Sequence, residues 1–282
     1  MAKDDAMPDM MVKMLATLGH AERLNVFRLL VRRYPQAVAA GELAEILGYK
    51  RSTLSVYLAV LRRAGLIHQD RAGNSLLYSA DLDGAGQLLS YLFDDCCRSR
   101  FPSAQPAEAQ LRERRLGRKF NVLFICSGNS VRSIFAEAIL RTEGKDRFNV
   151  YSAGTRPYSE INPITLKILE EHGHPTGILR SKNIAEFQGM NAPIMDFVFT
   201  VCDQAADEEC PAWPGQPLTA HWGYPDPAKV EGSDAARRAA FEDAYHSLTR
   251  RIRPFAQLGL EALDRSAIQR EVDRLGRLPL SA

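Results

Sequence analysis

The chain has 282 residues, of which 45% are hydrophobic and 25% charged. This balance is typical of folded globular proteins, and the length predicts two domains. A net charge of +2 excludes a chain that is cationic throughout, and no stretch approaches the roughly 20 consecutive apolar residues that span a bilayer. The first 13 residues lack the cationic start and apolar core of a signal peptide. We therefore expect a cytoplasmic protein without a membrane partner.

Residues 98–117 separate two segments of different composition. They contain two prolines and no long apolar run, which is typical of a linker. Up to Gly117 the chain has 16 Lys and Arg against 13 Asp and Glu, and from Arg118 onward it has 20 against 21. We predict an N-terminal domain at 1–97, a linker at 98–117 and a C-terminal domain at 118–282. The small net charge hides a basic bias in the first domain.

Two short helical patterns lie within residues 41–66. Gly48 stands between them as a helix stop, and Ser52 or Thr53 offers a side-chain oxygen to cap the second helix. This spacing predicts a helix-turn-helix, and two β-prone runs around residues 71–74 then predict a hairpin wing. The apolar positions are Leu43, Ile46 and Leu47 in the first helix and Leu54, Leu58 and Leu61 in the second.

The order of these elements resembles the ArsR family of winged-helix repressors over roughly residues 11–97. The resemblance implies a mainly α domain that forms a homodimer through its first helix and the helix from Asp81 to Cys97. It also implies that the helix from about Ser52 to Arg63 enters the major groove of operator DNA. Ser52, Thr53, Ser55 and Tyr57 would then meet bases or phosphates, and Lys50, Arg51, Arg71 and Asn74 would contact the DNA backbone. The alternative is that these are ordinary solvated surface positions.

Cys96 and Cys97 end the predicted dimer helix. Adjacent thiols are poorly placed to pair with each other, but two thiolates can chelate a soft ion. Members of the resembling family sense metals or arsenite through cysteines, which makes arsenite a candidate inducer. Arsenite favours three sulfurs, so a third ligand would have to come from a partner subunit or a small thiol. The alternative is an incidental pair at a helix end.

Residues 119–140 predict a buried strand, a loop and a helix, with the signature Cys-x5-Arg-Ser between the strand and the helix. Five residues between Cys126 and Arg132 let the backbone curl so that its N–H groups point inward at a helix N-terminus, a geometry that binds tetrahedral oxyanions. These dipoles and the Ser133 hydroxyl favour a thiolate at Cys126, and Arg132 offers a two-pronged donor. The intervening oxyanion-binding residues are Ser127, Gly128, Asn129, Ser130 and Val131, where Gly128 permits the turn and Asn129 could brace it.

This strand, loop and helix resemble the low-molecular-weight tyrosine phosphatase fold. The resemblance implies an α/β domain with a parallel four-stranded sheet, in which Asp226, within the sequence His-Trp-Gly-Tyr-Pro-Asp-Pro, acts as general acid. A turn aspartate before proline is the alternative for Asp226. The loop and Asp226 are equally compatible with a phosphatase and with an arsenate reductase.

Cys202 and Cys210 favour the reductase. A hydrolytic phosphatase uses one cysteine and water, whereas three thiols can relay electrons; incidental cysteines are the alternative. The arrangement closely resembles thioredoxin-coupled arsenate reductases over most of residues 119–260. That resemblance implies a cascade in which Cys126 attacks arsenate, Cys202 attacks Cys126 and releases arsenite, and Cys210 moves the disulfide outward for reduction. Seven residues separate Cys202 from Cys210, against six in some members, so glutathione with glutaredoxin stays open as the donor.

Together these features predict an arsenic-responsive DNA-binding regulator fused to an arsenate reductase, with no tightly bound cofactor. Its expected partners are operator DNA, thioredoxin, arsenate and arsenite. Two alternatives remain from the sequence: a protein tyrosine phosphatase with a DNA-targeting module, and a repressor whose catalytic half only senses oxyanions.

Overall fold

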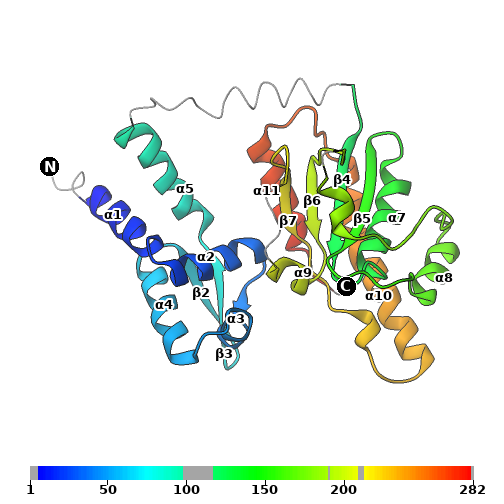
Figure 1. Cartoon of the computed structure of the whole chain (residues 1–282), viewed down its shortest axis with the longest axis horizontal. Helices are drawn as coiled ribbons and strands as arrows, with labels where there is room; N and C mark the ends of the chain where they lie inside the picture. The colour runs from blue at the N-terminus through cyan, green and yellow to red at the C-terminus, as the bar shows by residue number, and fades with distance from the viewer. Residues whose placement is uncertain (1–5, 98–116, 190, 209–212, 281–282) are drawn as a thin grey trace. The chain divides into compact units, whose positions relative to one another are not determined.

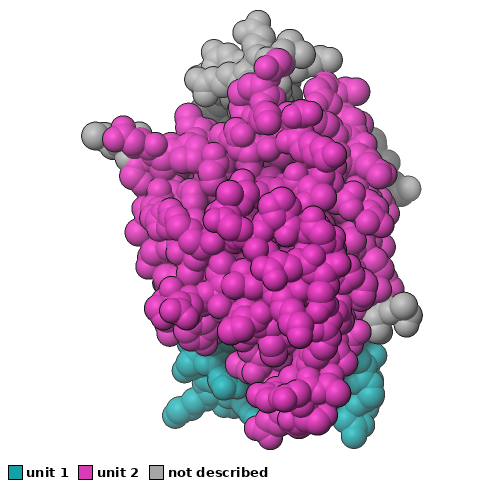
Figure 2. Space-filling view, turned by 90° about the vertical axis from the view of Figure 1, so that its right-hand side faces the viewer, with its two compact units in different colours: residues 1–109 teal, residues 110–282 magenta. Residues whose placement is uncertain are grey.

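The structure is a computed structural model that describes residues 6–97, 117–189, 191–208 and 213–280. The chain divides into two compact units, Met1–Ala109 and Gln110–Ala282 (Figure 2). The linker predicted at 98–117 lies outside the described residues except for Gly117. Among the described helices, none has the length and apolar character needed to cross a membrane.

Within residues 6–97 of the first unit, five helices accompany a small antiparallel sheet of order β1-β3-β2 (Figure 1). Helix α5 continues directly into a π-helical turn, η1, which ends at Cys96. The elements in chain order are α1 (Ala6–Leu18), α2 (Ala21–Arg33), β1 (Val38–Ala39), α3 (Ala40–Leu47), α4 (Arg51–Arg63), β2 (Ile67–Ala72), β3 (Ser75–Ala80), α5 (Leu82–Ser90) and η1 (Tyr91–Cys96).

Helices α3 and α4 form the predicted helix-turn-helix, and β2 and β3 form the hairpin that follows it. Gly48 ends α3 with a φ of 67°, a left-handed conformation that glycine adopts at little cost. The predicted side-chain cap of α4 is wrong: the helix begins at Arg51, and its N-cap Lys50 makes no side-chain hydrogen bond to it. Because the helix starts this early, Ser52 and Thr53 lie inside its first turn and are exposed.

The second unit contains a four-stranded parallel sheet of order β5-β4-β6-β7, as predicted (Figure 1). Helix α7 packs along α10, and α11 packs on the edge strand β7. The strands are β4 (Phe120–Cys126), β5 (Phe148–Gly154), β6 (Phe197–Thr200) and β7 (Leu218–His221). The helices are α7 (Arg132–Gly144), α8 (Pro163–Glu171), α9 (Asp203–Asp207), α10 (Asp234–Gln257) and α11 (Arg265–Gly276), with short 3-10 turns η2 (Ile184–Phe187) and η3 (Pro227–Lys229).

An aromatic cluster forms the core behind the sheet. The ring of Trp222 stacks on Phe199 with centroids 4.2 Å apart, and its Nε1 donates to the carbonyl of Val272 in α11 at 2.9 Å. Fully burying side chains of this kind contributes about 1.5–3 kcal/mol each. Because the strands are parallel, their carboxyl ends meet at one edge of the sheet, and this core fixes the positions of the loops that leave there.

Candidate functional site

The loop of residues 126–132, called the anion loop below, leaves the carboxyl end of β4 and enters α7. Four of its carbonyl oxygens accept hydrogen bonds from backbone N–H groups of the segment 155–162. These bonds run from Thr155 to Cys126 (3.1 Å), Arg156 to Ser127 (2.9 Å), Tyr158 to Gly128 (2.9 Å) and Asn162 to Ser130 (3.2 Å). These bonds fix the curled backbone of the loop, a conformation that can turn N–H groups toward a bound oxyanion.

Asn129 braces the anion loop from within. Its backbone is left-handed, with a φ of 43°, and the residue is fully buried. Its Nδ2 donates to the hydroxyls of Ser133 (2.9 Å) and Ser152 (2.8 Å), and its Oδ1 accepts from the backbone N–H of Lys182 at 2.6 Å. One amide therefore ties the loop to α7, to β5 and to the segment before η2.

Two glycines allow the close packing around this loop. A Cβ on Gly154 would lie 2.6 Å from the carbonyl oxygen of Ser127, and a Cβ on Gly128 would lie 2.5 Å from the ring of Tyr158. A side chain on Gly154 would push this backbone aside, whereas one on Gly128 would require the ring of Tyr158 to move. The ring of Tyr158 itself is largely exposed beside Gly128.

The sulfur of Cys126 is buried within the anion loop. It lies 2.9 Å from the Ser133 Oγ and accepts a hydrogen bond from the backbone N–H of Asn129 at 3.2 Å. Donors at these positions stabilise negative charge on the sulfur. The arrangement suits a nucleophilic thiolate that faces a bound oxyanion.

Arg132 connects the anion loop to the segment that carries Asp226. Its Nη1 donates to the carbonyl of Tyr224 and its Nη2 to Oδ2 of Asp226, both at 2.9 Å. Its Nε is buried and has no hydrogen-bond partner among the described residues. The guanidinium thus holds Asp226 at the loop, and within the described part of the chain its Nε–H has no partner that would compete with a further acceptor.

A buried charged network, which sequence reasoning missed, supports the loop from behind. Glu137 of α7 is 1% exposed and accepts from Ser152 Oγ (2.5 Å), from Lys182 Nζ (2.9 Å) and from Arg141 (2.7 Å). Because Ser152 also binds Asn129, the network reaches the anion loop. A glutamate inside the apolar stretch 134–140 was the one available signal, since carboxylates are seldom fully buried without partners.

Cys202 follows β6 and lies close to the anion loop. It is 1% exposed, and its sulfur accepts from the backbone N–H of Ala205 and lies 3.4 Å from the Oγ of Ser127, the residue next to Cys126. Burial raises the pKa of the Cys202 thiol, and charge on Cys126 raises it further. Arg132 and Ser127 act in the opposite direction. Cys210, the third predicted cysteine, lies outside the described residues.

The predicted DNA-contacting residues lie on α4 and on the hairpin of the first unit. Tyr57 is half-buried, with its ring edge-on to Tyr49 at 5.8 Å, so less of it is available than the sequence suggested. Cys96 is exposed and Cys97 half-buried, and both are free thiols. The remaining candidates are all exposed: Lys50, Arg51, Ser52, Thr53, Ser55, Arg71 and Asn74.

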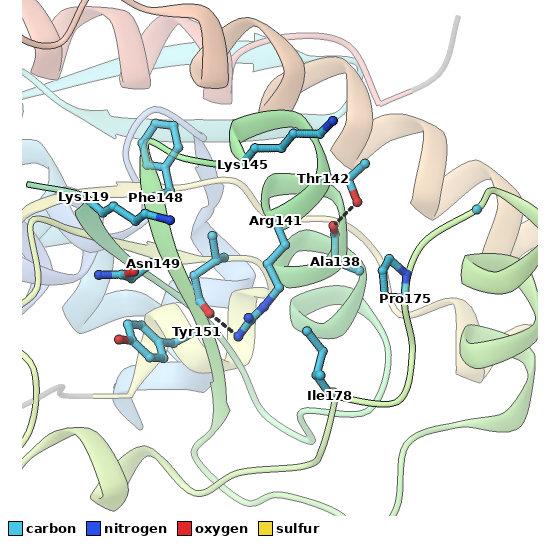
Figure 3. A pocket seen from close by; sticks show the side chains of 12 residues that line it. Lys119, Ala138, Arg141, Thr142, Lys145, Phe148, Asn149, Tyr151, Pro175 and Ile178 are labelled. Atoms are coloured by element: carbon cyan, nitrogen blue, oxygen red, sulfur yellow. Dashed lines mark hydrogen bonds between the residues drawn. The ribbon is translucent and has the colours of Figure 1, made fainter.

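A separate cavity of about 590 Å³ lies between α7 and β5 (Figure 3). Arg141 crosses it to donate to the carbonyl of Val150, and neither the cysteines nor Asp226 line it. Its lining has several polar residues, of which Arg141 and Lys119 pair with the carboxylates of Glu137 and Asp146. The polar lining residues include Lys119, Arg141, Thr142, Lys145, Asn149 and Tyr151.

Comparison with known protein families identifies a segment of each domain. Residues 121–271 match the model of the low molecular weight phosphotyrosine protein phosphatase family, and residues 18–70 match a helix-turn-helix domain. The first match spans more than half of the chain, and the chain belongs to that family. Within it, the relatives that match this chain include arsenate reductases.

The arsenate reductase of Halalkalibacterium halodurans is 37% identical over 138 residues, which are 49% of this chain and 96% of that protein. That of Bacillus licheniformis is 37% identical over 141 residues, 50% of this chain and 98% of its own. A solved thioredoxin-dependent arsenate reductase from Corynebacterium glutamicum is 24% identical, with a TM-score of 0.38, over 77% of this chain and 92% of that one. The predicted fusion of a helix-turn-helix domain with an arsenate-reductase domain is confirmed.

Proposed function

We propose that this protein reduces arsenate to arsenite by a cascade of three cysteines, and that its first domain is an operator-binding regulator that responds to arsenic. One observation carries the enzymatic part. The Oγ of Ser127, directly after Cys126, lies 3.4 Å from the sulfur of Cys202, so a second thiol adjoins the anion loop. A hydrolytic phosphatase has no use for such a thiol.

In the first step the inward N–H groups of the anion loop bind arsenate, with the free Nε of Arg132 as a further donor. The thiolate of Cys126 attacks arsenic and forms a sulfur–arsenic bond. An arsenate oxygen leaves as water once it has received a proton, and the carboxyl of Asp226, held beside the loop by Arg132, supplies it. Arsenic remains As(V) in this covalent adduct.

In the second step Cys202 attacks the sulfur of Cys126. A Cys126–Cys202 disulfide forms, the sulfur–arsenic bond breaks, and its electron pair passes to arsenic, which leaves as As(III) arsenite. Formation of the adduct removes the negative charge of Cys126, which had helped to raise the pKa of Cys202. Cys202 therefore ionises more readily after arsenate has reacted, and this orders the two steps.

In the third step Cys210 attacks Cys202, and the Cys126 thiolate leaves ready for another turnover. The resulting Cys202–Cys210 disulfide takes two electrons from a dithiol donor. We assign this role to thioredoxin, with glutathione and glutaredoxin as the competing donor system. No cofactor needs to be tightly bound at any step.

The deciding experiment measures arsenite production by the full chain, supplied with NADPH and either the thioredoxin or the glutaredoxin system. The thioredoxin system should sustain turnover, and Cys202→Ala should abolish it. The same variant should bind arsenate normally and still form one equivalent of the Cys126 adduct, without further turnover. If the unsubstituted chain makes no arsenite but hydrolyses an aryl phosphate, and Cys202→Ala leaves that hydrolysis unchanged, the phosphatase alternative is established instead. Binding of arsenate without arsenite production would establish the oxyanion sensor.

For the first domain, the exposed polar residues at the start of α4 support DNA binding, and the free Cys96 and Cys97 support capture of arsenite. We assign a homodimer because a winged helix reads a two-fold operator best as a pair. In a mobility-shift assay arsenite should release operator DNA from the chain, and Cys96→Ser with Cys97→Ser should prevent this release. If arsenite leaves the unsubstituted complex intact, the regulatory proposal fails while the enzymatic one stands.

A further inference from the structure

We propose that His172, Glu242 and His246 form a binding site for a divalent transition metal ion of the zinc type. One ligand atom from each of the three lies within 4.8 Å of the others. None of the three belongs to the anion loop, to the cysteine relay or to the segment of Asp226. The site would thus be an addition to the reaction centre rather than a part of it.

The three side chains come from two packed helices. His172 is the residue that ends α8, while Glu242 and His246 are four residues apart in α10 and therefore share one helix face. Oε2 of Glu242 lies 3.2 Å from Nε2 of His172 and 3.9 Å from Nε2 of His246. Tetrahedral zinc with ligands at about 2.0–2.1 Å separates neighbouring ligand atoms by about 3.3 Å. Small side-chain rotations would bring the observed distances between ligand atoms to this spacing.

The packing around the cluster orients the imidazoles. The ring of His172 stacks on Tyr245 with centroids 4.1 Å apart and an interplanar angle of 20°, and it meets His246 edge-on at 5.6 Å. Tyr245 is itself fixed, because it is buried and its hydroxyl lies 2.8 Å from Nε2 of His174. The stacked ring of His172 therefore presents its Nε2 to Glu242 from a fixed support.

Glu242 is oriented in a similar way. Its Oε1 accepts from Nη2 of Arg238 at 3.0 Å, which leaves Oε2 directed at both imidazoles. Support of this kind behind a ligand is usual in metal sites and commonly affects affinity about 10–100-fold. Arg238 also pairs with Glu171, which offsets its positive charge near the cation.

The donor set favours zinc over harder cations. Two imidazole nitrogens with one carboxylate oxygen suit Zn²⁺ and its neighbours, whereas Mg²⁺ and Ca²⁺ prefer oxygen ligands alone. His172 and His246 are both exposed, so an ion has an entry path and water can complete its coordination. The ion would therefore have three protein ligands and one coordination position open to water.

A bound ion would connect α8 to α10. Helix α8 begins at Pro163, directly after Asn162, whose N–H binds the carbonyl of Ser130 in the anion loop. Zinc should therefore stabilise the domain thermally and hold the support of the loop in place. This effect is a readout of the site that does not depend on arsenate turnover.

The test uses the full chain with all five cysteines changed to serine, because thiolates bind zinc themselves. After treatment with a chelator, calorimetric titration with zinc chloride should show one ion per chain and a raised midpoint of thermal unfolding. Glu242→Gln and His246→Ala should each weaken binding by about 10-fold or more. Asp243→Asn is the matched control, since it removes an exposed carboxylate from the next position of α10 and should leave binding unchanged.

Two outcomes would overturn the proposal: no saturable binding of a single ion, or an equal loss of affinity in Asp243→Asn and Glu242→Gln. If the cysteine-free chain fails to fold, cobalt added to the unsubstituted chain decides instead. A tetrahedral cobalt spectrum that Glu242→Gln removes supports the site. A spectrum that this variant leaves unchanged, with only sulfur-to-cobalt bands, assigns the ion to cysteines and refutes it.

Discussion

Arg132 and Asp226 form an ion pair in which Nη2 of the arginine lies 2.9 Å from Oδ2 of the aspartate. The aspartate side chain also receives the backbone N–H of Ala228 at 3.1 Å, so it caps the short turn η3. The anion-binding arginine and the proposed proton donor are thus positioned by one another. Arg132 and the backbone N–H of Ala228 together hold the Asp226 carboxyl group beside the anion loop.

Asp226→Asn should separate the chemical role of this carboxyl from its structural one. The amide can still accept from Arg132 and cap η3, but it has no acidic proton to give. We expect kcat for arsenate to fall by about 10²–10⁴-fold with KM little changed. Asp264→Asn is the control, since Asp264 caps α11 in the same way, away from the anion loop, and should keep full turnover. Equal kcat values in the two variants would show that Asp226 is not the general acid.

Ser127→Ala should alter the pH dependence of arsenite release. The Ser127 hydroxyl lowers the pKa of the buried Cys202 thiol, so its loss should raise that pKa further. Because Cys202 attacks as a thiolate, the rate of release in a single turnover should rise with pH, and the variant should need a higher pH for the same rate. Ser127→Thr keeps the hydroxyl and should follow the unsubstituted profile. Coinciding profiles for the alanine and threonine variants would contradict this.

Gly154→Ala should displace the anion loop without unfolding the domain. The new Cβ would lie 2.6 Å from a backbone oxygen of Ser127, which cannot turn away as a side chain does. Misplacement of a reacting group by about 1 Å can cost about 10²-fold in rate, so we expect a loss of that order in kcat/KM for arsenate. Gly177→Ala is the control, because a Cβ there meets nothing within 4 Å. If Gly154→Ala were as active as Gly177→Ala, the loop would be able to accommodate the new Cβ without loss of activity.

Lys182→Met should destabilise the second domain. It removes the ammonium partner of the buried Glu137 while Arg141 still pairs with that carboxylate, so we expect a loss of about 1–3 kcal/mol. The comparison is Arg180→Met, which breaks an exposed pair with Glu186 and should cost at most about 1 kcal/mol. Urea unfolding of both variants measures the difference. Adding Glu137→Gln to Lys182→Met should recover part of the loss, and no recovery would mean that the two side chains act independently.

The sequence was sufficient for features that depend on neighbouring residues. Cys-x5-Arg-Ser between an apolar run and a helical pattern predicted the anion loop, and the apolar run before Cys126 predicted the buried strand that leads into it. The paired helices around Gly48 were equally local. In each case the backbone geometry follows from residues within about one turn or strand of each other.

Contacts between distant segments could not be predicted. Glu137, Ser152 and Lys182 meet behind the loop from three separate segments, and no periodicity relates them. The ion pair of Arg132 with Asp226 joins residues that are 94 positions apart, so the motif around Arg132 could not predict it. The start of α4 was misplaced for another reason: Ser52 and Thr53 are good caps, but the helix extends past them to Arg51.

The four hydrogen bonds that fix the curled backbone of the anion loop all come from main-chain N–H groups between residues 155 and 162. Within that segment, Pro157, which has no N–H to give, stands at a position that makes none of these bonds. The side chains of Arg156 and Tyr158 are therefore not needed to hold the loop, and both are exposed. Substituting either by a residue other than proline should keep these backbone bonds, and so change the surface beside the loop without moving the loop itself.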